Sequence, residues 1–365
     1  MSEVTITIEQ IESVESHPNA DRLEITRVAG TQTIILKGQF QAGDLCVYFP
    51  PDILLPGDVS DQLGVTKYLK HAIWEGFRFP CRVTATRLRG TPSYGFVQPL
   101  AVLGMVKQPP VGTDVTETFR GDKYEPPVKV YRGCGGLASE PINFSRYIDI
   151  QHYRKYRHLL PEGILVRITE KIHGTNSRVA LLKVDGEWSF YSGSHKTARK
   201  RIDPEGRESV YWYPLQQEGV LSLLTDLCDE RWGSGRDVIF FGELYGPGVQ
   251  DLDYGIPAGA IGWRLFDIAV EGRYLDWPLV KGYCHDYGIE TVPLLYEGPF
   301  HLDLVDQLTY GPTTVAETVK SKFKGREGIV ITPITETYCC IGRLILKSVS
   351  ADYLDRKGAQ DNGEV

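Results

Sequence analysis

The stretch Ile164-Leu-Val-Arg-Ile-Thr-Glu-Lys-Ile-His-Gly-Thr-Asn176 decides how this chain is interpreted. It begins with an apolar run rich in β-branched residues, which is typical of a buried strand. Glu170, Lys171 and Gly174 follow at the end of that run and form a Lys-x-x-Gly pattern. A pattern with two fixed residues is expected roughly once by chance in a chain of this length. The pattern therefore does not identify a site by itself.

Four later segments attach a polar or aromatic side chain to an apolar strand. They are Phe241-Gly-Glu243-Leu-Tyr-Gly246, Leu265-Phe266-Asp-Ile268, Glu327-Gly-Ile-Val-Ile331 and Leu344-Ile-Leu-Lys347. A strand is a rigid support, and functional side chains are commonly held in a cleft in this way. The series predicts a cleft to which Lys171, Glu243, Phe266, Glu327 and Lys347 contribute.

These five segments, in this order, resemble motifs I, III, IIIa, IV and V of the covalent nucleotidyltransferase superfamily, which contains ATP-dependent ligases and mRNA capping enzymes. The form Glu-Lys-Ile-His-Gly-Thr-Asn carries His173 where DNA ligases usually have aspartate, and it is most similar to RNA ligases. The resemblance covers about residues 145–355. It implies an ATP-dependent RNA ligase that requires a divalent metal, Mg²⁺ or Mn²⁺.

The resemblance also implies a role for each motif residue. Lys171 would be the nucleophile that takes AMP from ATP, and Lys347 would contact the α-phosphate. Glu327 would help to hold the metal through water. The remaining expected nucleotide contacts come from Glu170, Asn176, Glu243 on a ribose hydroxyl, and Phe266 stacked on adenine.

The chemistry of lysine suits the first of these roles. An ordinary lysine has a pKa near ~10.4, so it is protonated and not nucleophilic at neutral pH. Desolvation or a nearby cation lowers such a pKa and frees the amine. Attack on the α-phosphorus of ATP would expel pyrophosphate and leave a lysyl-AMP phosphoramidate. A metal ion and a second lysine would stabilise the charge that spreads over the phosphoryl oxygens.

Two segments depart from the superfamily pattern. Motif V usually reads Lys-x-Lys, but Ile345 occupies the first lysine position, and whether Arg343 compensates is left open. Motif Ia supplies a basic residue after motif I, and Ser194-His-Lys196-Thr-Ala-Arg199 is the best candidate. We favour Lys196 over Arg199 there as a further contact to the nucleotide, and we expect both to contact nucleic acid.

The N-terminal part predicts a small β-barrel. Residues 4–8, 23–28, 45–49 and 82–88 are short strand-like runs separated by turns. Ser16-His-Pro-Asn-Ala-Asp-Arg-Leu-Glu-Ile25 is similar to OB-fold tRNA-binding modules, and the likeness continues from Arg87-Leu-Arg-Gly90 to Tyr94-Gly-Phe96. OB barrels bind nucleic acid through basic and aromatic side chains on one face, so we expect Arg87 and Arg89 to contact it.

The predicted fold is α+β: an N-terminal OB-like barrel at 1–125, a linker at 126–145 and an adenylyltransferase domain of antiparallel sheets flanked by helices at 146–365. Helices are expected near 210–231 and 302–324, and a tight hairpin turn at Asp185-Gly186. Only 18 residues follow Lys347, so no C-terminal OB domain is expected. This layout resembles RNA ligases that seal 3′-OH and 5′-phosphate ends in nicked duplexes with RNA on the 3′-OH side.

Composition sets the remaining limits. The chain of 365 residues has no apolar stretch of about 20 residues, so we expect no membrane partner. It also has no signal-peptide pattern. We therefore expect an intracellular, cytoplasmic protein, and a nuclear location stays open. Seven scattered cysteines without a Cys-x-x-Cys pair do not indicate a zinc cluster or a disulfide framework. The net charge of −7 disfavours a simple nucleic-acid coating protein. It is compatible with an enzyme whose basic residues are clustered.

Two alternatives stay open. Another nucleotidyltransferase, such as an mRNA guanylyltransferase, would form its adduct with GTP. A non-catalytic RNA-binding protein with a degenerate ligase fold would form no adduct, and Ile345 is the residue that favours it. RNA repair is the expected biological pathway, and no oligomeric state is predicted.

Overall fold

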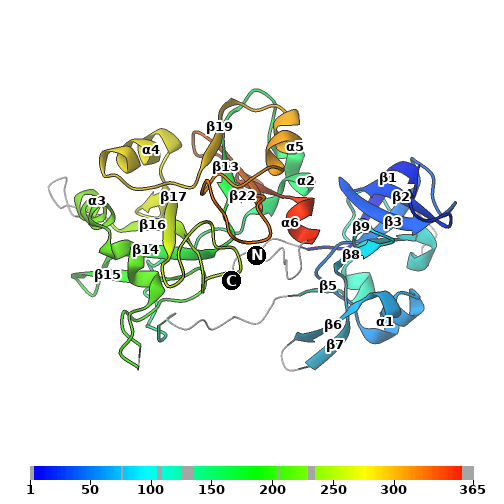
Figure 1. The fold of residues 1–365 in the computed structure, drawn as a ribbon, viewed down its shortest axis with the longest axis horizontal. Helices are drawn as coiled ribbons and strands as arrows, with labels where there is room; N and C mark the ends of the chain where they lie inside the picture. Colours follow the sequence, from blue (N-terminus) through cyan, green and yellow to red (C-terminus); the bar gives the residue numbers. More distant parts are fainter. Residues whose placement is uncertain are drawn as a thin grey trace. The chain divides into compact units, whose positions relative to one another are not determined.

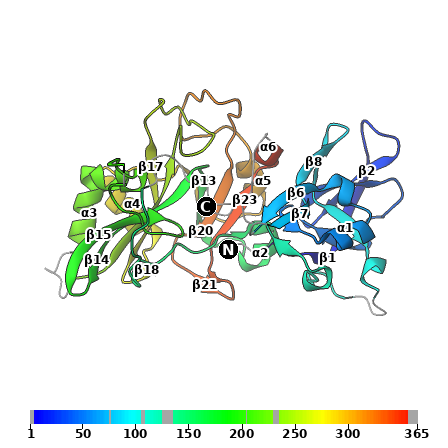
Figure 2. The same cartoon turned by 90° about the horizontal axis from the view of Figure 1, so that it is seen from below.

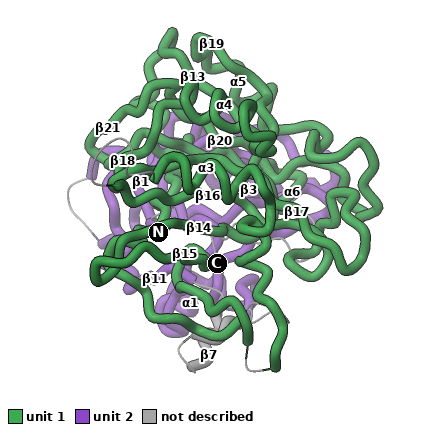
Figure 3. Tube along the Cα trace, turned by 90° about the vertical axis from the view of Figure 1, so that its left-hand side faces the viewer, with its two compact units in different colours: residues 1, 128–365 green, residues 2–127 purple. Residues whose placement is uncertain are grey.

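The computed structural model describes residues 4–74, 77–104, 109–124, 135–203, 205–228 and 235–355. The chain forms two compact units, residues 2–127 and 128–365, which Figure 3 shows in different colours. Both are built mainly from antiparallel strands with few helices (Figure 1). The first half of the predicted linker, up to residue 134, lies outside the described residues.

Unit 2–127 contains a five-stranded antiparallel sheet in the order β10-β4-β1-β2-β3, with a second, four-stranded sheet and a short hairpin beside it. Its strands are β1 (Thr7–Ser16), β2 (Leu23–Val28), β3 (Thr31–Leu36), β4 (Leu45–Phe49), β5 (Ile53–Leu54), β6 (Lys70–Trp74), β7 (Phe77–Arg82), β8 (Ala85–Leu88), β9 (Thr91–Tyr94), β10 (Phe96–Pro99) and β11 (Asp122–Lys123). Its helices are α1 (Gly57–Gln62), η1 (Thr66–Tyr68), η2 (Leu100–Leu103) and η3 (Glu117–Phe119).

The predicted strands at 23–28 and 45–49 are confirmed in this unit. The first strand begins at Thr7 and is longer than predicted. The predicted strand at 82–88 is wrong as a single element, because the chain breaks between β7 and β8. Val83 lies at this break, and its backbone N–H and C=O bond to Ile53 and Asp52 instead. The alternating pattern continues through residues 82–88, although the backbone changes its pairing partner there.

Unit 128–365 contains two five-stranded sheets. The first sheet has the order β12-β23-β20-β13-β19 and the second has the order β15-β14-β16-β17-β18; β13, β20 and β23 lie side by side in Figure 2. The strands are β12 (Gln151–His152), β13 (Leu165–Lys171), β14 (Thr175–Val184), β15 (Glu187–Ser194), β16 (Val238–Tyr245), β17 (Gly262–Val270), β18 (Arg273–Tyr274), β19 (Leu294–Pro299), β20 (Gly328–Pro333), β21 (Tyr338–Cys339), β22 (Gly342–Arg343) and β23 (Leu346–Val349). The helices are α2 (Tyr153–Tyr156), η4 (Arg157–Leu159), η5 (Val210–Gln216), α3 (Glu218–Cys228), α4 (Trp277–Asp286), α5 (Asp303–Thr309) and α6 (Ala351–Asp355).

The hydrophobic core of this unit lies on both faces of the sheets. Helices α3 and α4 cover one face of the second sheet, where Leu224 and Val280 pack against Phe240. Helices α2 and α5 cover one face of the first sheet. The other faces of the two sheets meet, because Val330 of β20 packs in one cluster with Phe241 of β16. Phe266 of β17, which packs in the same cluster, also lies along this meeting.

Most local predictions for this unit are confirmed. Val184 pairs with Glu187 across the turn at Asp185-Gly186, and both turn residues have positive φ, as a two-residue hairpin with this right-handed twist requires. The helix near 210–231 is present as η5 and α3 over its described part. The helix expected over 302–324 is wrong beyond Thr309, because Gly311 and Pro312 end it. No helix among the described residues is long and apolar enough to span a membrane.

Candidate active site

Lys171 and Lys347 lie on the same face of the first sheet. Lys171 pairs with Gly328 of β20, and Thr169, two residues before it, pairs with Val330, which in turn pairs with Lys347. Directly paired residues, and residues two apart on one strand, share a face. The shared face is the one that carries Val330 and packs against the second sheet. Two lysines far apart in the sequence are therefore held by backbone pairing on one side of a rigid sheet.

Lys171 forms an ion pair with Glu327. Its Nζ is 2.6 Å from Oε1 of Glu327, and the lysine side chain is 17% exposed while the glutamate is 3% exposed. The other carboxylate oxygen, Oε2, is buried and has no hydrogen-bond partner in the described part of the chain, and Nδ1 of His173 lies 3.7 Å from it. A buried carboxylate oxygen without a hydrogen bond is costly, unless a ligand or its water meets it.

His173 is held from three sides. Its Nε2 donates to Oδ1 of Asp251 at 2.8 Å, the hydroxyl of Tyr353 donates to its Nδ1 at 2.9 Å, and its backbone N–H donates to the hydroxyl of Tyr254 at 2.7 Å. The carboxylate of Asp251 can only accept, so these contacts fix the tautomer. Asp251, Tyr254 and Tyr353 were not predicted. They lie between 78 and 180 residues from His173, and no local pattern links them to it.

Gly174 brings motif I and motif III together. A Cβ at this position would lie 2.1 Å from the backbone oxygen of Leu244 and 3.0 Å from Oε1 of Glu243. Only glycine allows this approach without moving the backbone of β16. Gln250 secures the contact from the other side, because its Nε2 donates to the carbonyl of Gly174 at 3.2 Å. The glycine of the Lys-x-x-Gly pattern is thus required by packing against the strand that carries Glu243.

We predict that Gly174→Ala lowers the free energy of unfolding by about 1–3 kcal/mol, because the backbone must move to accommodate the methyl group. The same shift should displace Glu243 relative to Lys171. Gly282→Ala is the matched control, since Gly282 lies exposed in α4 and a Cβ added there would meet no atom within 4 Å. There alanine should be neutral or stabilising by up to ~1 kcal/mol. Urea unfolding of both variants checks this, and equal effects would contradict it.

Asn176 and Glu243 lie directly opposite each other on β14 and β16. Asn176 is 1% exposed, and neither its Oδ1 nor its Nδ2 has a hydrogen-bond partner within the described ranges. Glu243 is partly exposed on the same face. A buried amide is normally satisfied, so an amide left open beside a carboxylate indicates a place for a polar ligand.

Phe266 is the extra residue of a β-bulge. Phe241 pairs with Asp267 and Gly242 pairs with Leu265, which leaves Phe266 without a partner on β16. Bulges are enriched beside active sites, where they redirect a side chain. The ring is partly buried and meets Tyr147 edge-on, with ring centroids 4.9 Å apart and an interplanar angle of 69°. Phe266 also packs against the clusters that contain Val330 and Val349 of the first sheet.

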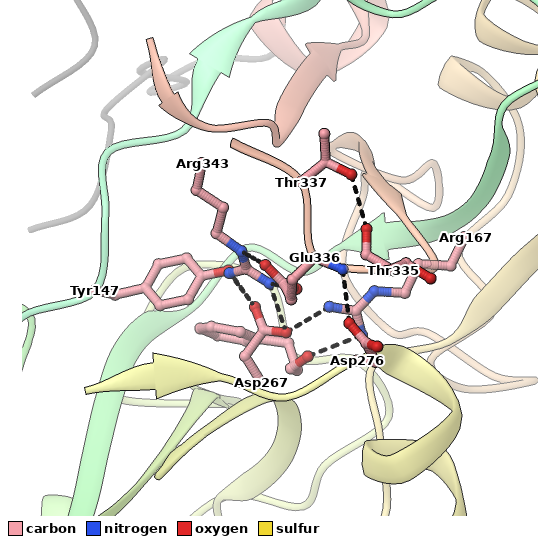
Figure 4. A network of polar contacts seen from close by, with 9 residues as sticks. Tyr147, Arg167, Asp267, Asp276, Thr335, Glu336, Thr337 and Arg343 are labelled. Atoms are coloured by element: carbon pink, nitrogen blue, oxygen red, sulfur yellow. Dashed lines mark hydrogen bonds and ion pairs between the residues drawn. The ribbon is translucent and has the colours of Figure 1, made fainter. Parts of the chain in front are cut away.

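Arg343 belongs to a buried network that links the two sheets (Figure 4). Its Nη1 and Nη2 bond to the carboxylate of Asp267 at 2.8 and 3.1 Å, and its Nε bonds to Glu336 at 2.6 Å. Arg167 of β13 donates to the same Asp267 at 2.5 Å, and the hydroxyl of Tyr147 also donates to it. Because these contacts occupy every nitrogen group of its guanidinium, Arg343 does not compensate for the missing lysine of motif V.

Asp267 is ionised in this network. Burial alone would raise the pKa of its carboxyl, but Arg343 and Arg167 outweigh burial and lower the pKa to about 2. Burial raises the pKa of Glu336, which shares Arg343. Two arginines from the side of the first sheet therefore meet one ionised carboxylate of the second sheet, next to Phe266.

Ile345 is buried in the core beside this network. It is 2% exposed and packs with Tyr147, Phe241 and Val330. The strand expected from Leu344 begins only at Leu346, because the chain first pairs β22 with β21 and joins the first sheet two residues later, at β23. The backbone carbonyl of Arg343 accepts from the N–H of Ile345 at this bend. The isoleucine is a packing residue here.

We predict that Ile345→Lys destabilises the protein by about 3–5 kcal/mol, because it buries a cation without an acidic partner. It should not increase nucleotide transfer, although it restores the superfamily sequence. Ile345→Val is the matched control, with an expected loss of about 0.5–1.5 kcal/mol. Urea unfolding together with an adduct assay measures both. A lysine variant as stable as the valine variant would contradict this account of Ile345.

Glu170 is not brought together with the other predicted residues. It alternates with Lys171 along β13, so its side chain lies on the opposite face of the first sheet. There its carboxylate accepts from the hydroxyl of Thr313 at 2.5 Å and from the N–H and hydroxyl of Thr314, both at 2.7 Å. Glu170 thus anchors the segment that follows α5. This placement does not support the predicted side-chain contact to a nucleotide.

Lys196 and Arg199 lie after β15, beside the segment that precedes β12. Lys196 is partly exposed and lines a pocket of about 530 Å³ together with Arg146 and Phe144. The guanidinium of Arg199 donates to the carbonyl of Gly135 at 3.3 Å and lies 5.8 Å from the ring centre of Tyr211. Arg199 is therefore engaged in packing, whereas Lys196 faces a pocket.

Arg87 and Arg89 lie in the other unit, at the tip of the β8–β9 hairpin, and both are exposed. The predicted aromatic residues of that unit do not accompany them. Tyr94 is 6% exposed, and Phe96 stacks on Phe49 inside the core with ring centroids 4.5 Å apart. Tyr94 and Phe96, the aromatic residues that continued the likeness to OB modules, therefore serve the packing of the barrel.

Comparisons with known proteins agree with this architecture. A family model described as RNA ligase matches residues 164–349, and an OB-fold domain model matches residues 5–100. A variant of an RNA ligase from Naegleria gruberi, solved without ligand, has a TM-score of 0.75 at 21% identity over 98% of this chain and 100% of that chain. A variant of that ligase with ATP and Mn gives 0.70 at 21% identity over 96% and 97%, and one with AMP and Mn gives 0.75 at 22% over 98% and 100%. No curated protein sequence matches.

At such identity the solved structures show the shared fold, an OB-fold unit followed by the two-sheet unit. The family model is evidence for the family as well as for the fold. Its match extends from the start of β13 to the end of β23 and includes all five motif segments. That match covers just over half of the 365 residues. The chain belongs to the RNA ligase family.

Proposed function

We propose that this protein is an ATP-dependent ligase that joins a 3′-OH end to a 5′-phosphate end, at nicks in duplexes with RNA on the 3′-OH side. It acts in three steps. Lys171 attacks the α-phosphorus of ATP, its Nζ–P bond forms as the bond to pyrophosphate breaks, and lysyl-AMP results. The 5′-phosphate then takes AMP from Lys171, and finally the 3′-OH attacks that phosphate and releases AMP.

The observation that carries the proposal is the placement of Lys171 and Lys347 on one sheet face, with the carboxylate of Glu327 2.6 Å from the lysine nitrogen. Transfer from ATP requires a nucleophile, a cation to offset charge on the phosphoryl oxygens, and control of the lysine proton. Lys171 supplies the nucleophile and Lys347 the cation. The carboxylate of Glu327 is placed to accept a proton from the Lys171 side chain. If another ligand occupies this carboxylate, its ion pair with Lys171 breaks and the amine is released.

The nucleotide is assigned to the meeting of the two sheets. Asn176 offers a buried amide with open hydrogen-bonding capacity, and Glu243 lies beside it as the acceptor for a ribose hydroxyl. Phe266, redirected by the bulge, is the ring assigned to stack on adenine. The Naegleria gruberi structures with ATP and with AMP have the same fold and support ATP as the nucleotide.

The residues present suit a divalent cation held mainly by water and phosphate. Within the described residues no group of three His, Cys, Asp or Glu side chains could cage a metal by itself. Mg²⁺ commonly uses one or two carboxylates together with waters and phosphates. The buried Oε2 of Glu327 is free to accept from a metal-bound water. Such a cation would lower the cost of placing negative charge on the transferring phosphoryl group.

Nucleic acid is assigned to Lys196 and Arg199 near the active site and to Arg87 and Arg89 on the OB unit. Lys196 has the better support of the first pair, since it faces a pocket and Arg199 is used in packing. Unlike these residues, Glu170 is proposed to act by holding the segment at Thr313 and Thr314. The proposed location is intracellular, as expected from the sequence.

The nucleotide is tested by incubating the protein with radiolabelled ATP or GTP and Mg²⁺ or Mn²⁺ and denaturing it before electrophoresis. We expect a covalent adduct with ATP and none with GTP. An adduct with GTP alone would indicate a guanylyltransferase, and no adduct with either would indicate the non-catalytic alternative.

The substrate is tested with matched nicked duplexes whose 3′-OH strand is RNA or DNA. We expect sealing when the 3′-OH strand is RNA and much less sealing when it is DNA. Sealing that ignores the sugar at the 3′-OH side would contradict this part of the proposal while leaving ligation itself established.

A further inference from the structure

The β8–β9 hairpin of the OB unit ends in a tip that the loop at residues 17–22 holds in place. His17 is buried; its Nδ1 accepts from the N–H of Asn19 at 3.0 Å, so its Nε2 carries the proton and donates to the carbonyl of Leu88 at 3.1 Å. The side-chain Nδ2 of Asn19 donates to the carbonyl of Arg89 at 3.2 Å. The tip is thus bonded at two successive carbonyls.

The tip itself is a two-residue turn. Leu88 pairs with Thr91, and Arg89 and Gly90 both have positive φ, 51° and 88°. An arginine is rarely found in this region, and side chains other than glycine, asparagine and aspartate adopt it at a cost in backbone strain. The contacts from His17 and Asn19 offset that strain. An arginine is therefore held at the outermost point of a hairpin where the turn geometry alone would favour a smaller residue.

The base of the hairpin is fixed to the edge strand β3. The Nε2 of Gln32 donates to the carbonyl of Pro92 at 2.7 Å, and the N–H of Ile34 donates to the hydroxyl of Ser93 at 3.0 Å. The hydroxyl of Thr33 donates to the carbonyl of Tyr94 at 3.3 Å. The hairpin is consequently a rigid projection from the barrel.

Four basic side chains are exposed around this tip, and they define what we call the basic tip: Arg22, Lys37, Arg87 and Arg89. Arg22 ends the loop that carries Asn19, and its carbonyl accepts from the N–H of Lys37 at 3.0 Å. Two acids are nearby. Glu24 is engaged with the N–H of Gly38 at 2.9 Å, and Asp21 is exposed. The local charge stays positive although the chain as a whole carries −7.

The basic tip lacks aromatic residues, since no Phe, Tyr or Trp occurs at positions 17–22, 36–39 or 87–90. Single-stranded nucleic acid is usually bound by stacking bases on exposed rings. Arginine and lysine without such rings bind the phosphates of the backbone. These contacts are electrostatic, and they position the nucleic acid without reading its sequence. A rigid tip suits a backbone of fixed geometry, as in a duplex.

We propose that the basic tip is a docking site for the phosphodiester backbone of duplex nucleic acid, with His17 and Asn19 as the residues that position it. This inference rests on the proposed function for the identity of the substrate. It adds Arg22 and Lys37 to the surface and gives His17 and Asn19 a positioning role. In this proposal the OB unit binds backbone phosphates, whereas OB barrels more often bind nucleic acid by stacking its bases on aromatic side chains.

The test is fluorescence anisotropy with a labelled nicked RNA duplex and the full chain, at several salt concentrations. Each phosphate contact contributes about 0.9 to the slope of log K against log salt for a B-form duplex, and removing one cation lowers the slope by about 1. The double variant Arg87→Gln/Arg89→Gln should therefore lose affinity roughly tenfold or more at low salt, and its slope should fall by about 2.

Two matched variants separate charge from structure. Arg87→Lys/Arg89→Lys keeps both charges and should keep the slope, whereas a loss equal to that of the glutamine pair would overturn the proposal. Lys67→Gln removes a charge from η1, outside the basic tip, and should bind like the wild type. Wild-type affinity and slope in the glutamine pair would also overturn it.

A second probe, the single strand alone, tests the chemistry of the contact. Because the backbone charge is common to both probes, the glutamine pair should weaken both. A loss confined to the single strand would indicate contacts to bases and would overturn the proposal. Adduct formation by the wild type with ATP is measured in parallel: without an adduct the proposed function fails, while a fallen slope would still support the basic tip.

Discussion

Lys171→Ala is expected to abolish the covalent adduct with ATP, with a loss on the order of 10³-fold or more, as for other catalytic nucleophiles. Lys347 lies on the same face of the first sheet, but on β23, two strands away from Lys171. Its own pairing with Val330 of β20 fixes it there. Lys347 therefore cannot take over the position that backbone pairing gives to Lys171. The measurement is the yield of radiolabelled protein after denaturation.

The same variant should still seal a nick that already carries AMP on its 5′-phosphate. That substrate has the activated phosphoanhydride, so the final attack by the 3′-OH does not require the lysine. Lys171→Ala leaves the carboxylate of Glu327, whose side chain is 3% exposed, without its ion pair, so urea unfolding is used to check that the variant is folded before the assay. Loss of sealing on the pre-adenylated nick would mean that Lys171 acts in the last step as well.

Asp267→Ala is expected to lower the free energy of unfolding by about 3–5 kcal/mol, because it leaves two buried arginines without their shared carboxylate. Both Arg167 and Arg343 are less than a tenth exposed, and Asp267 is 1% exposed. Urea unfolding monitored by tryptophan fluorescence measures the loss. Five of the six tryptophans lie in residues 128–365, so the signal reports mainly on the unit that contains the network.

Arg201→Ala is the control for Asp267→Ala. Arg201 pairs with Glu208 at 2.8 Å in the same unit, but its side chain is 63% exposed. An exposed pair of this kind contributes less than about 1 kcal/mol. If Asp267→Ala cost no more than Arg201→Ala, the network of Figure 4 would not hold the two sheets together.

Acid should weaken the same network. The folded-state pKa of Asp267 is about 2, below the ordinary value of 3.8. A carboxyl with a lowered pKa contributes stability that is present above its unfolded pKa and is lost as the pH falls toward the folded pKa. The difference in unfolding free energy between wild type and Asp267→Asn should stay constant from pH 8 to 5 and shrink from about pH 4 toward 2. A difference independent of pH over this range would contradict the ionised assignment.

Much of the candidate site could be predicted because its residues lie on strands. Strands β13, β16, β17 and β20 begin and end within a few residues of the predicted runs. Alternation along β13 also separates Lys171 from Glu170, and this consequence of strand geometry could have been drawn from the sequence. Order along the chain was informative because each motif residue is fixed to a strand of the two sheets.

Other features depend on contacts that a local pattern does not contain. Asp251 and Tyr353 meet His173 from distant segments, and the Arg343–Asp267 contact joins residues 76 apart. Helix periodicity beyond Thr309 was misleading, because Thr313 and Thr314 are used to hold Glu170. In the OB unit, Tyr94 and Phe96 continue the likeness to OB modules, but no local pattern shows that they pack inside the barrel.

The most direct test of the central claim is to react the wild-type protein with ATP, digest it, and locate AMP by mass spectrometry. The account predicts AMP on the peptide that contains Lys171, with fragmentation placing it on that side chain. AMP on any other residue, including Lys347, would contradict the assignment of Lys171 as the nucleophile.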